Sequence, residues 1–168
     1  MSTAQKRLET DYQKVIELVG RSNGALKLLR TTGTPPRTYE FEFNCPSLVM
    51  GRLGSPEVKY QHRVEVSLGT DYPFTKPGAR MLTPIFNPHI FSTGTFCLGS
   101  QWRPTETLDT LIIWIGAILV MDPKVLDFNS PANGEANQWA QENLSRLPLG
   151  QMVFKSPNKQ APRIRWND

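Results

Sequence analysis

Residues 83–104 read TPIFNPHIFSTGTFCLGSQWRP, and this stretch decides how the rest of the chain is interpreted. Its three prolines and two glycines fit neither a long helix nor a central strand. An irregular stretch of this length in a compact domain is usually functional or disordered. Its apolar residues, which argue against disorder, are Ile85, Phe86, Ile90, Phe91, Phe96, Leu98 and Trp102. We therefore predict an ordered, packed and functional loop.

The segments before this loop carry the pattern of an antiparallel sheet. Residues 38–43 (TYEFEF) alternate aromatic and acidic side chains, and residues 60–68 repeat the alternation with aliphatic ones. Shorter apolar runs at 25–31 and 79–83 complete four expected strands. The connections are short and carry glycine and proline, which indicates a four-stranded antiparallel meander.

Helical periodicity stands on both sides of the expected sheet. At the N-terminus, Ser2 and Gln5 fit a capping box, and the stripe that follows consists of Leu8, Tyr12, Val15, Ile16 and Val19. After the loop, residues 107–121 form an apolar helix that Pro123 stops, and residues 132–147 form another. The order of helix, strands, long loop and two helices predicts an α+β fold.

The size and charge of the chain suit one domain with a basic tail. The chain has 168 residues, so we expect one domain that is large enough for a catalytic site over residues 1–149 and an irregular tail over 150–168. The net charge is +4, but basic and acidic residues are interspersed, and only the tail has a local basic excess. Taken alone, the positive net charge would favour a nucleic-acid-binding domain. No stripe of interleaved basic and aromatic residues supports it, so we expect no nucleic-acid partner.

Cysteine usage and hydropathy place the expected protein in the cytoplasm. Two cysteines, Cys45 and Cys97, make no disulfide framework, and no signal peptide precedes the first helix. The apolar run at 111–121 is shorter than the roughly 18 residues of a membrane span, so we expect no membrane partner. With two histidines and no metal-ligand spacing, neither a metal nor a cofactor is expected.

Several spaced motifs resemble the ubiquitin-conjugating enzyme family. They are Tyr72-Pro73-Phe74 with Pro77, the tripeptide Asn87-Pro88-His89, Cys97-Leu98, Trp102 with Pro104, and Ser130-Pro131-Ala132-Asn133. The cysteine stands eight residues after the last member of the tripeptide, which is the family's spacing. The resemblance covers about residues 2 to 147, and the predicted order of helices and strands is also the family's.

The departures from the family pattern concern the same loop. The family tripeptide is His-Pro-Asn, and here the two polar residues are exchanged. The tryptophan follows the cysteine by five positions, where many members have eight, and the loop from 121 to 130 is longer than usual. An irregular tail replaces the C-terminal helix of many members. Such chains resemble those of bacterial ubiquitin-like conjugation operons, which gives bacterial antiviral defence as the expected setting.

The resemblance implies that Cys97 is a catalytic nucleophile. From the residues alone, a lone cysteine is more often a small buried hydrophobe, although this one lies in a Gly/Pro loop that a partner could reach. The implied chemistry is transthiolation, in which Cys97 accepts a ubiquitin or ubiquitin-like protein as a thioester and passes it to an amine, with lysine as the expected acceptor. For Cys45, packing at a strand end is expected.

The polar residues of the tripeptide carry the implied oxyanion role. By position, His89 takes the place of the family's oxyanion-stabilising asparagine, and Asn87 takes the structural place. An imidazole N–H can donate to an oxyanion, and a neutral imidazole can take a proton from the attacking amine. Two alternatives stay open: Asn87 reaches the oxyanion from the other side, or His89 only caps a turn.

Two further groups follow from the resemblance. Ser130 takes the place of the family residue that positions or deprotonates the incoming lysine, with Asn129 adjacent and Asp127 nearby; alternatively Ser130 caps a helix that starts at Pro131. The family surface gripped by the activating enzyme or a ligase corresponds to Phe74, Pro104, Lys6 and Arg7, while Trp102 is expected to be structural. The implied partners are a ubiquitin-like protein, an activating enzyme and a target protein, and the need for a ligase stays open. The competing interpretation is a non-catalytic variant that only binds a ubiquitin-like protein.

Overall fold

The sheet predicted from alternating residues is present in the computed structural model, which describes residues 1–99 and 102–155. Its strands are β1 (Leu26–Thr32), β2 (Thr38–Phe43), β5 (His62–Ser67) and β6 (Gly78–Met81). They pair in the order β1-β2-β5-β6, antiparallel throughout, which confirms the predicted meander. The aromatic side chains of β2 face a core, while its two glutamates pair with basic residues of β1 and β5 on the other face.

A second, two-stranded sheet was not predicted. It consists of β3 (Ser47–Met50) and β4 (Pro56–Lys59), which lie between the predicted strands at 38–43 and 60–68. The two strands are four residues each and turn at Gly54, whose φ of +78° favours glycine. Such short strands give too little alternation to be recognised.

The first helix follows its predicted cap but not all of its predicted stripe. α1 (Thr3–Arg21) starts at Ser2, and both bonds of the capping box with Gln5 are made. Leu8, Val15 and Leu18 are buried, whereas Ile16, predicted to widen the stripe, is 42% exposed. The prediction for Ile16 is wrong because the core face of α1 lies on the side of Leu8, Val15 and Leu18, where Asp11 is buried as well.

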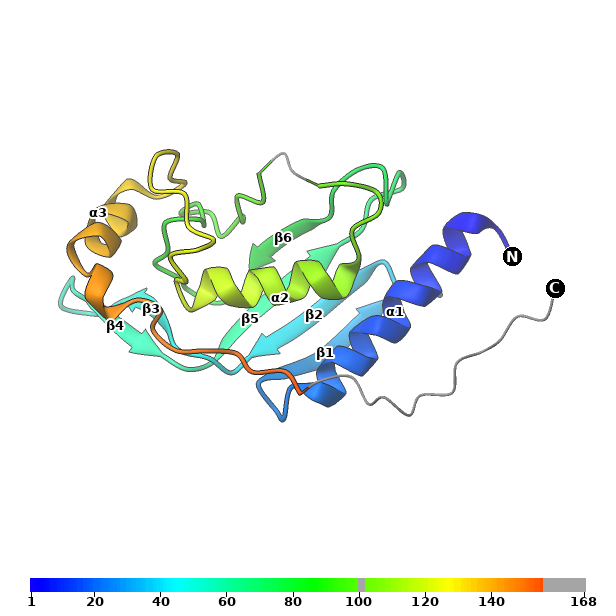
Figure 1. Cartoon of the computed structure of the whole chain (residues 1–168), viewed down its shortest axis with the longest axis horizontal. Helices are drawn as coiled ribbons and strands as arrows, with labels where there is room; N and C mark the ends of the chain where they lie inside the picture. Colours follow the sequence, from blue (N-terminus) through cyan, green and yellow to red (C-terminus); the bar gives the residue numbers. More distant parts are fainter. Residues whose placement is uncertain (100–101, 156–168) are drawn as a thin grey trace.

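The later helices differ in how well the sequence located them. α2 (Leu108–Leu119) lies within the predicted 107–121 and crosses the face of the sheet (Figure 1). α3 (Gly134–Glu142), followed by the 3-10 helix η1 (Leu144–Arg146), is shorter than the predicted 132–147. Its N-cap is Asn133, whose side chain accepts a hydrogen bond from the Ala136 amide at 3.1 Å. The alternative in which Ser130 caps this helix is therefore wrong.

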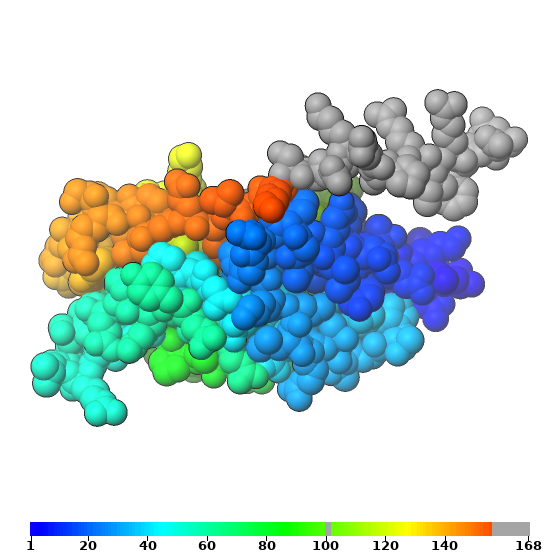
Figure 2. Space-filling model, turned by 90° about the horizontal axis from the view of Figure 1, so that it is seen from below, coloured from blue at the N-terminus to red at the C-terminus, as the bar shows by residue number. Residues whose placement is uncertain are grey.

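The segment after α3 is packed against the domain through residue 155. It runs across one face of the molecule from α3 towards α1 (Figure 2). Its backbone bonds to Val120 O through Leu149 N and to Arg21 O through Lys155 N, each at 2.8 Å. Met152 and Phe154 pack on the main core. The first six residues of the predicted tail thus lie on the domain, and its basic residues Lys159, Arg163 and Arg165 lie outside the described residues.

Within residues 1–99 and 102–155, no helix has the length and hydropathy needed to cross a membrane.

Candidate functional site

Cys97 lies at the end of a hairpin folded against the edge strand β6. The hairpin is joined by the Ile90–Phe96 bridge and by the Cys97 amide, which donates to His89 O at 2.8 Å. Phe96 N bonds to Ala79 O at 3.0 Å, which holds the hairpin on β6. The predicted loop is thus ordered, and most of its apolar side chains are packed, although Phe91 is exposed. The Cys97 side chain itself is half-buried.

A glycine allows the hairpin to approach β6 closely. Gly94 has a φ of +91°, and a Cβ there would come within 3.2 Å of Met81 O. The same glycine carbonyl accepts a hydrogen bond from Met81 N at 2.8 Å. The position therefore suits glycine both in conformation and in space.

Asn87 is fully buried and fixes the tripeptide to the end of α2. Its side-chain amide donates to Ile118 O at 2.8 Å, and its oxygen accepts from the His89 amide at 2.9 Å. This is the structural place that the sequence predicted for Asn87. The alternative in which Asn87 reaches an oxyanion does not fit this geometry, because its donor group is buried and engaged.

His89 connects the cysteine to the loop before α3. Its Nε2 accepts a hydrogen bond from the Asp127 amide at 3.0 Å, so the proton of the neutral ring is on Nδ1. Nδ1 is 3.1 Å from Cys97 O and donates to it. With both nitrogens engaged, the neutral ring has no further N–H for an oxyanion in this arrangement. The ring holds two backbone segments together.

The segment between Asp127 and Ala132 forms an arch over the tripeptide. One end is tied by the Asp127 bond to His89, and the other by Ala132 N, which donates to Pro88 O at 2.8 Å. Asn129 and Ser130 lie between these two anchors and are exposed. The structure therefore brings both predicted residues to the part of the molecule that holds the cysteine.

The two cysteines differ in environment, as the sequence predicted. Cys45 is 2% exposed within the main core, and burial raises the pKa of its thiol to about 12. Its thiolate, the reactive form, is therefore disfavoured near neutral pH. Of the two cysteines, Cys97 is the one that is partly exposed.

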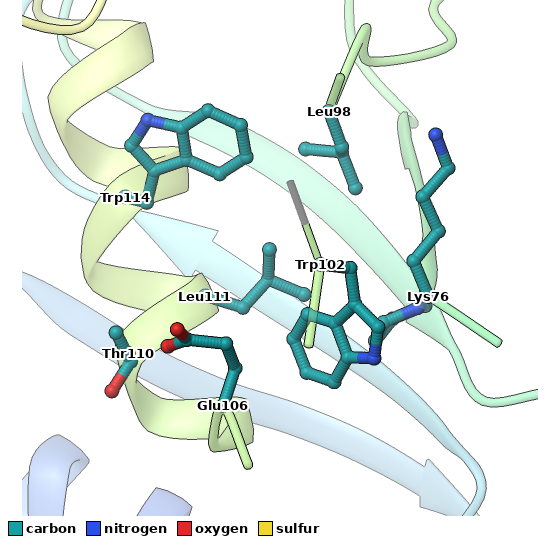
Figure 3. Close-up of a pocket in the computed structure, with 8 residues that line it drawn as sticks. Lys76, Leu98, Trp102, Glu106, Thr110, Leu111 and Trp114 are labelled. Carbon is teal, nitrogen blue, oxygen red and sulfur yellow. The ribbon is translucent and has the colours of Figure 1, made fainter. Parts of the chain in front are cut away.

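An apolar hollow of about 190 Å³ lies beside the cysteine and was not predicted. Trp102 and Trp114 stand on two sides of it, Leu111 lies between them, and Leu98, which follows Cys97, forms another wall (Figure 3). Lys76 and Glu106 also line it. A tryptophan at position 114, in a mostly aliphatic helix, was the feature of the sequence that could have indicated this hollow. The direction of its side chain could not be known from the sequence.

The predicted partner residues divide into two groups. Phe74 is 81% exposed, and Pro104 and Lys6 are exposed as well. Arg7 differs, because its side chain is only 21% exposed and turns inward to Asp11 and to the backbone before α2. Trp102 is structural, as predicted, since its indole N–H donates to Pro73 O at 2.7 Å. Among the described residues, no cluster of three His, Cys, Asp or Glu side chains could hold a metal.

Fold and site together define an α+β domain with a half-buried cysteine on a hairpin that the residues of the tripeptide hold in place. Residues 36–147 match the sequence profile of the family described as ubiquitin-conjugating enzyme. The chain belongs to the ubiquitin-conjugating enzyme family.

Individual relatives agree with this assignment. Ubiquitin-conjugating enzyme E2 T of Xenopus laevis is 28% identical over 157 residues, covering 80% of this chain and 82% of the relative. The human protein of that name is 30% identical over 113 residues, and the bovine one is 32% identical over 93. The match to the human protein covers 56% of this chain and 57% of the relative, and the bovine match covers 49% and 48%. The chain thus spans about half the length of these two relatives.

A solved structure shares the fold. A protein from Plasmodium yoelii, described as a ubiquitin-conjugating enzyme, superposes with a TM-score of 0.59 over 86% of this chain and 89% of that chain. At 20% sequence identity, this likeness concerns the fold alone.

Proposed function

We propose that this chain carries ubiquitin or a ubiquitin-like protein as a thioester on Cys97 and transfers it to an amine, with lysine of a target protein as the acceptor. The observation that carries this proposal is the half-buried Cys97 on a hairpin fixed by Asn87 and His89 in a member of this family. Cys45, by contrast, is buried in the main core and is not a candidate for contact with a second protein.

The proposed reaction has two displacement steps. The Cys97 thiolate attacks the carbonyl carbon of a modifier held as a thioester on the activating enzyme, a new C–S bond forms, and the activating enzyme's thiolate leaves. An amine nitrogen then attacks the same carbon, the new C–N bond forms, and Cys97 leaves as thiolate while the nitrogen loses a proton. Neither step needs an oxidant, a metal or a cofactor.

The side chains around Cys97 have separate proposed roles. His89 acts as a positioning residue, because its ring already bonds the Cys97 carbonyl and the Asp127 amide. The oxyanion role predicted for His89 requires one of these bonds to open and stays a prediction. Asn129 and Ser130, exposed on the arch above the tripeptide, orient the incoming amine.

The proposed partners follow from the exposed residues. Phe74, Pro104 and Lys6 form the surface for an activating enzyme or a ligase, with Phe74 as its large and exposed apolar side chain. The bacterial defence setting and the cytoplasmic location predicted from the sequence stay predictions.

The experiment that tests the function uses the second cysteine as a matched control. The protein is incubated with ATP, ubiquitin and a ubiquitin-activating enzyme, and the products are separated on a non-reducing gel. We expect a thiol-sensitive adduct in wild type and in Cys45→Ala, and none in Cys97→Ala. Tight ubiquitin binding without any adduct would support the non-catalytic interpretation instead.

A second experiment separates the two roles of His89. Discharge of preloaded Cys97 thioester to free lysine is measured for His89→Ala together with amide hydrogen exchange of Asp127. Slow discharge with fast exchange at Asp127 supports the positioning role, and slow discharge with unchanged exchange supports the oxyanion role. If His89→Ala discharges as fast as wild type, both roles are wrong.

A further inference from the structure

Asp11 is a buried carboxylate at the junction of three elements. It accepts hydrogen bonds from Arg7 Nε on its own helix at 2.7 Å, from the Tyr72 hydroxyl at 2.6 Å and from the Leu108 amide at the start of α2 at 3.2 Å. Its side chain is fully buried. A carboxylate removed from water needs such donors, because an unpaired buried charge is strongly unfavourable.

Arg7 extends this network to the segment between Trp102 and α2. Its two terminal nitrogens donate to Pro104 O and to Glu106 O, and its guanidinium lies 5.2 Å from the centre of the Tyr72 ring. One planar guanidinium thus bonds two side chains, Asp11 and the Tyr72 hydroxyl, and two backbone carbonyls in fixed directions. The segment around Pro104 is held by α1 rather than by regular structure of its own.

The segment around Phe74 is attached to the same network. Tyr72 donates to Asp11, and the Trp102 indole donates to Pro73 O at 2.7 Å. The rings of Tyr72 and Trp102 lie 5.9 Å apart. Burial, followed by the bond to Asp11, raises the pKa of Tyr72, so its hydroxyl keeps the proton that it donates. We call Arg7, Asp11 and Tyr72 the partner scaffold.

The partner scaffold is buried, but the side chains that it carries are exposed. Phe74 stands two residues after Tyr72, and Pro104 carries the carbonyl that Arg7 bonds. A partner that contacts both must find them at one fixed separation, and ordering two loose loops on binding would weaken the complex.

We propose that Asp11 and Arg7 are positioning residues for the partner surface: they fix the segments of Phe74 and Pro104 relative to each other, so that a partner protein binds both at once. This rests on the proposed function, which assigns Phe74 and Pro104 to that surface. Arg7 then acts through Asp11 and the backbone of residues 104–106, not by touching the partner as the sequence predicted.

The substitution Arg7→Lys distinguishes the two roles of Arg7. A lysine keeps the positive charge that a partner would contact, but its single ammonium cannot bond Asp11 and two carbonyls in the geometry of the guanidinium. If Arg7 contacts the partner by charge, Arg7→Lys should load ubiquitin like wild type. If Arg7 positions the two segments, Arg7→Lys should behave like Tyr72→Phe, which removes the hydroxyl bond to Asp11 and keeps the ring.

The test measures transfer of ubiquitin from a ubiquitin-activating enzyme to Cys97 as a function of the concentration of this protein. For Tyr72→Phe and Arg7→Lys we expect KM to rise about fivefold, with a smaller change in kcat, because each variant loses hydrogen bonds of the partner scaffold and the two segments are then held less firmly. Tyr60→Phe is the matched control, because Tyr60 is exposed and its KM should equal that of wild type. The KM of Phe74→Ala tests whether the activating enzyme contacts the partner surface.

A second readout needs no partner. Exchange of the Trp102 indole N–H and the Leu108 amide N–H is compared between wild type, Tyr72→Phe and Arg7→Lys, and we expect faster exchange in both variants. Unchanged exchange would overturn the positioning role whatever the loading result. If Phe74→Ala raises KM but Tyr72→Phe and Arg7→Lys do not, the positioning role is wrong while the partner surface stands. If Phe74→Ala loads like wild type, the proposed partner surface itself is wrong.

Discussion

The cysteine and the partner surface are supported in different ways. Behind Cys97, the side chains of Asn87 and His89 bond neutral backbone groups, among them the amides of His89 and Asp127; we call these two residues the cysteine scaffold. Behind Phe74, the partner scaffold gathers three donors on the single carboxylate of Asp11. The two scaffolds should therefore respond differently to substitution. Removing Asn87 or His89 takes the side-chain acceptor from a backbone amide, whereas Asp11 keeps two donors when one is lost.

The largest effect should come from Asn87→Ala in the cysteine scaffold. The change leaves Ile118 O and the His89 amide without the Asn87 partner in a buried place, and we expect the free energy of unfolding to fall by about 2–3 kcal/mol. Urea denaturation measures it. Asn44→Ala is the matched control, since the Asn44 amide bonds Gly24 O at the exposed surface, and it should cost about 0.5 kcal/mol.

A smaller loss is expected for Tyr72→Phe in the partner scaffold. Arg7 and the Leu108 amide still donate to Asp11, so the free energy of unfolding should fall by about 1 kcal/mol. The same denaturation experiment with the exposed Tyr60→Phe should show no change. A loss for Tyr72→Phe that exceeds the loss for Asn87→Ala would contradict the comparison.

The partner scaffold should also respond to alkali. The pKa of Tyr72 is raised by burial and by its bond to Asp11 above the ordinary value of 10.0. An unfolded chain releases this proton near pH 10 and the folded chain does so only at higher pH. The contribution of the protonated Tyr72 hydroxyl to the free energy of unfolding is therefore complete below pH 10 and is lost as the pH rises beyond it. Denaturation between pH 9 and 11 should show a shallower loss for Tyr72→Phe than for wild type, and equal slopes would contradict this assignment. The pKa of Tyr39 is raised too, so part of the slope remains in both proteins.

The smallest change in stability is expected for Phe74→Ala. The side chain is 81% exposed, so its loss should alter the free energy of unfolding by less than about 0.5 kcal/mol while loading by the activating enzyme falls. Leu53→Ala is the control, because Leu53 is 97% exposed on the turn between β3 and β4 and should leave both stability and loading unchanged. Equal loading by Phe74→Ala and Leu53→Ala would remove Phe74 from the partner surface.

Patterns that depend on neighbouring residues were predictable. The capping box of Ser2 and Gln5 and the bounds of β2 follow from spacing alone, because helices repeat every 3.6 residues and strands every two. The ordered cysteine loop was predictable from its apolar content. The strands β3 and β4 were missed because four residues carry too little periodicity, and Ser130 was wrongly offered as a cap because Asn133 competes for the same role.

The partners of polar side chains were not predictable. The burial of Asp11 was not predicted, although this residue lies three residues after Leu8 and four before Val15, on the core face of α1. Arg7 was assigned to the partner surface by the resemblance to the family, which carries no information on the direction of this side chain. Its backbone partners, Pro104 O and Glu106 O, are 97 and 99 positions away along the chain, and only chain folding brings them within hydrogen-bond reach.

The sequence by itself determined the α+β order of elements and the family, because these depend on local periodicity and on spaced motifs. The tertiary structure alone decided which hydrogen bonds the side chains of Asn87 and His89 make. It also placed Arg7, which was predicted on the partner surface, in the network around the buried Asp11. The physical reason is that a hydrogen bond depends on distances of about 3 Å and on direction. Residues far apart in the chain acquire such distances only when the whole domain has packed.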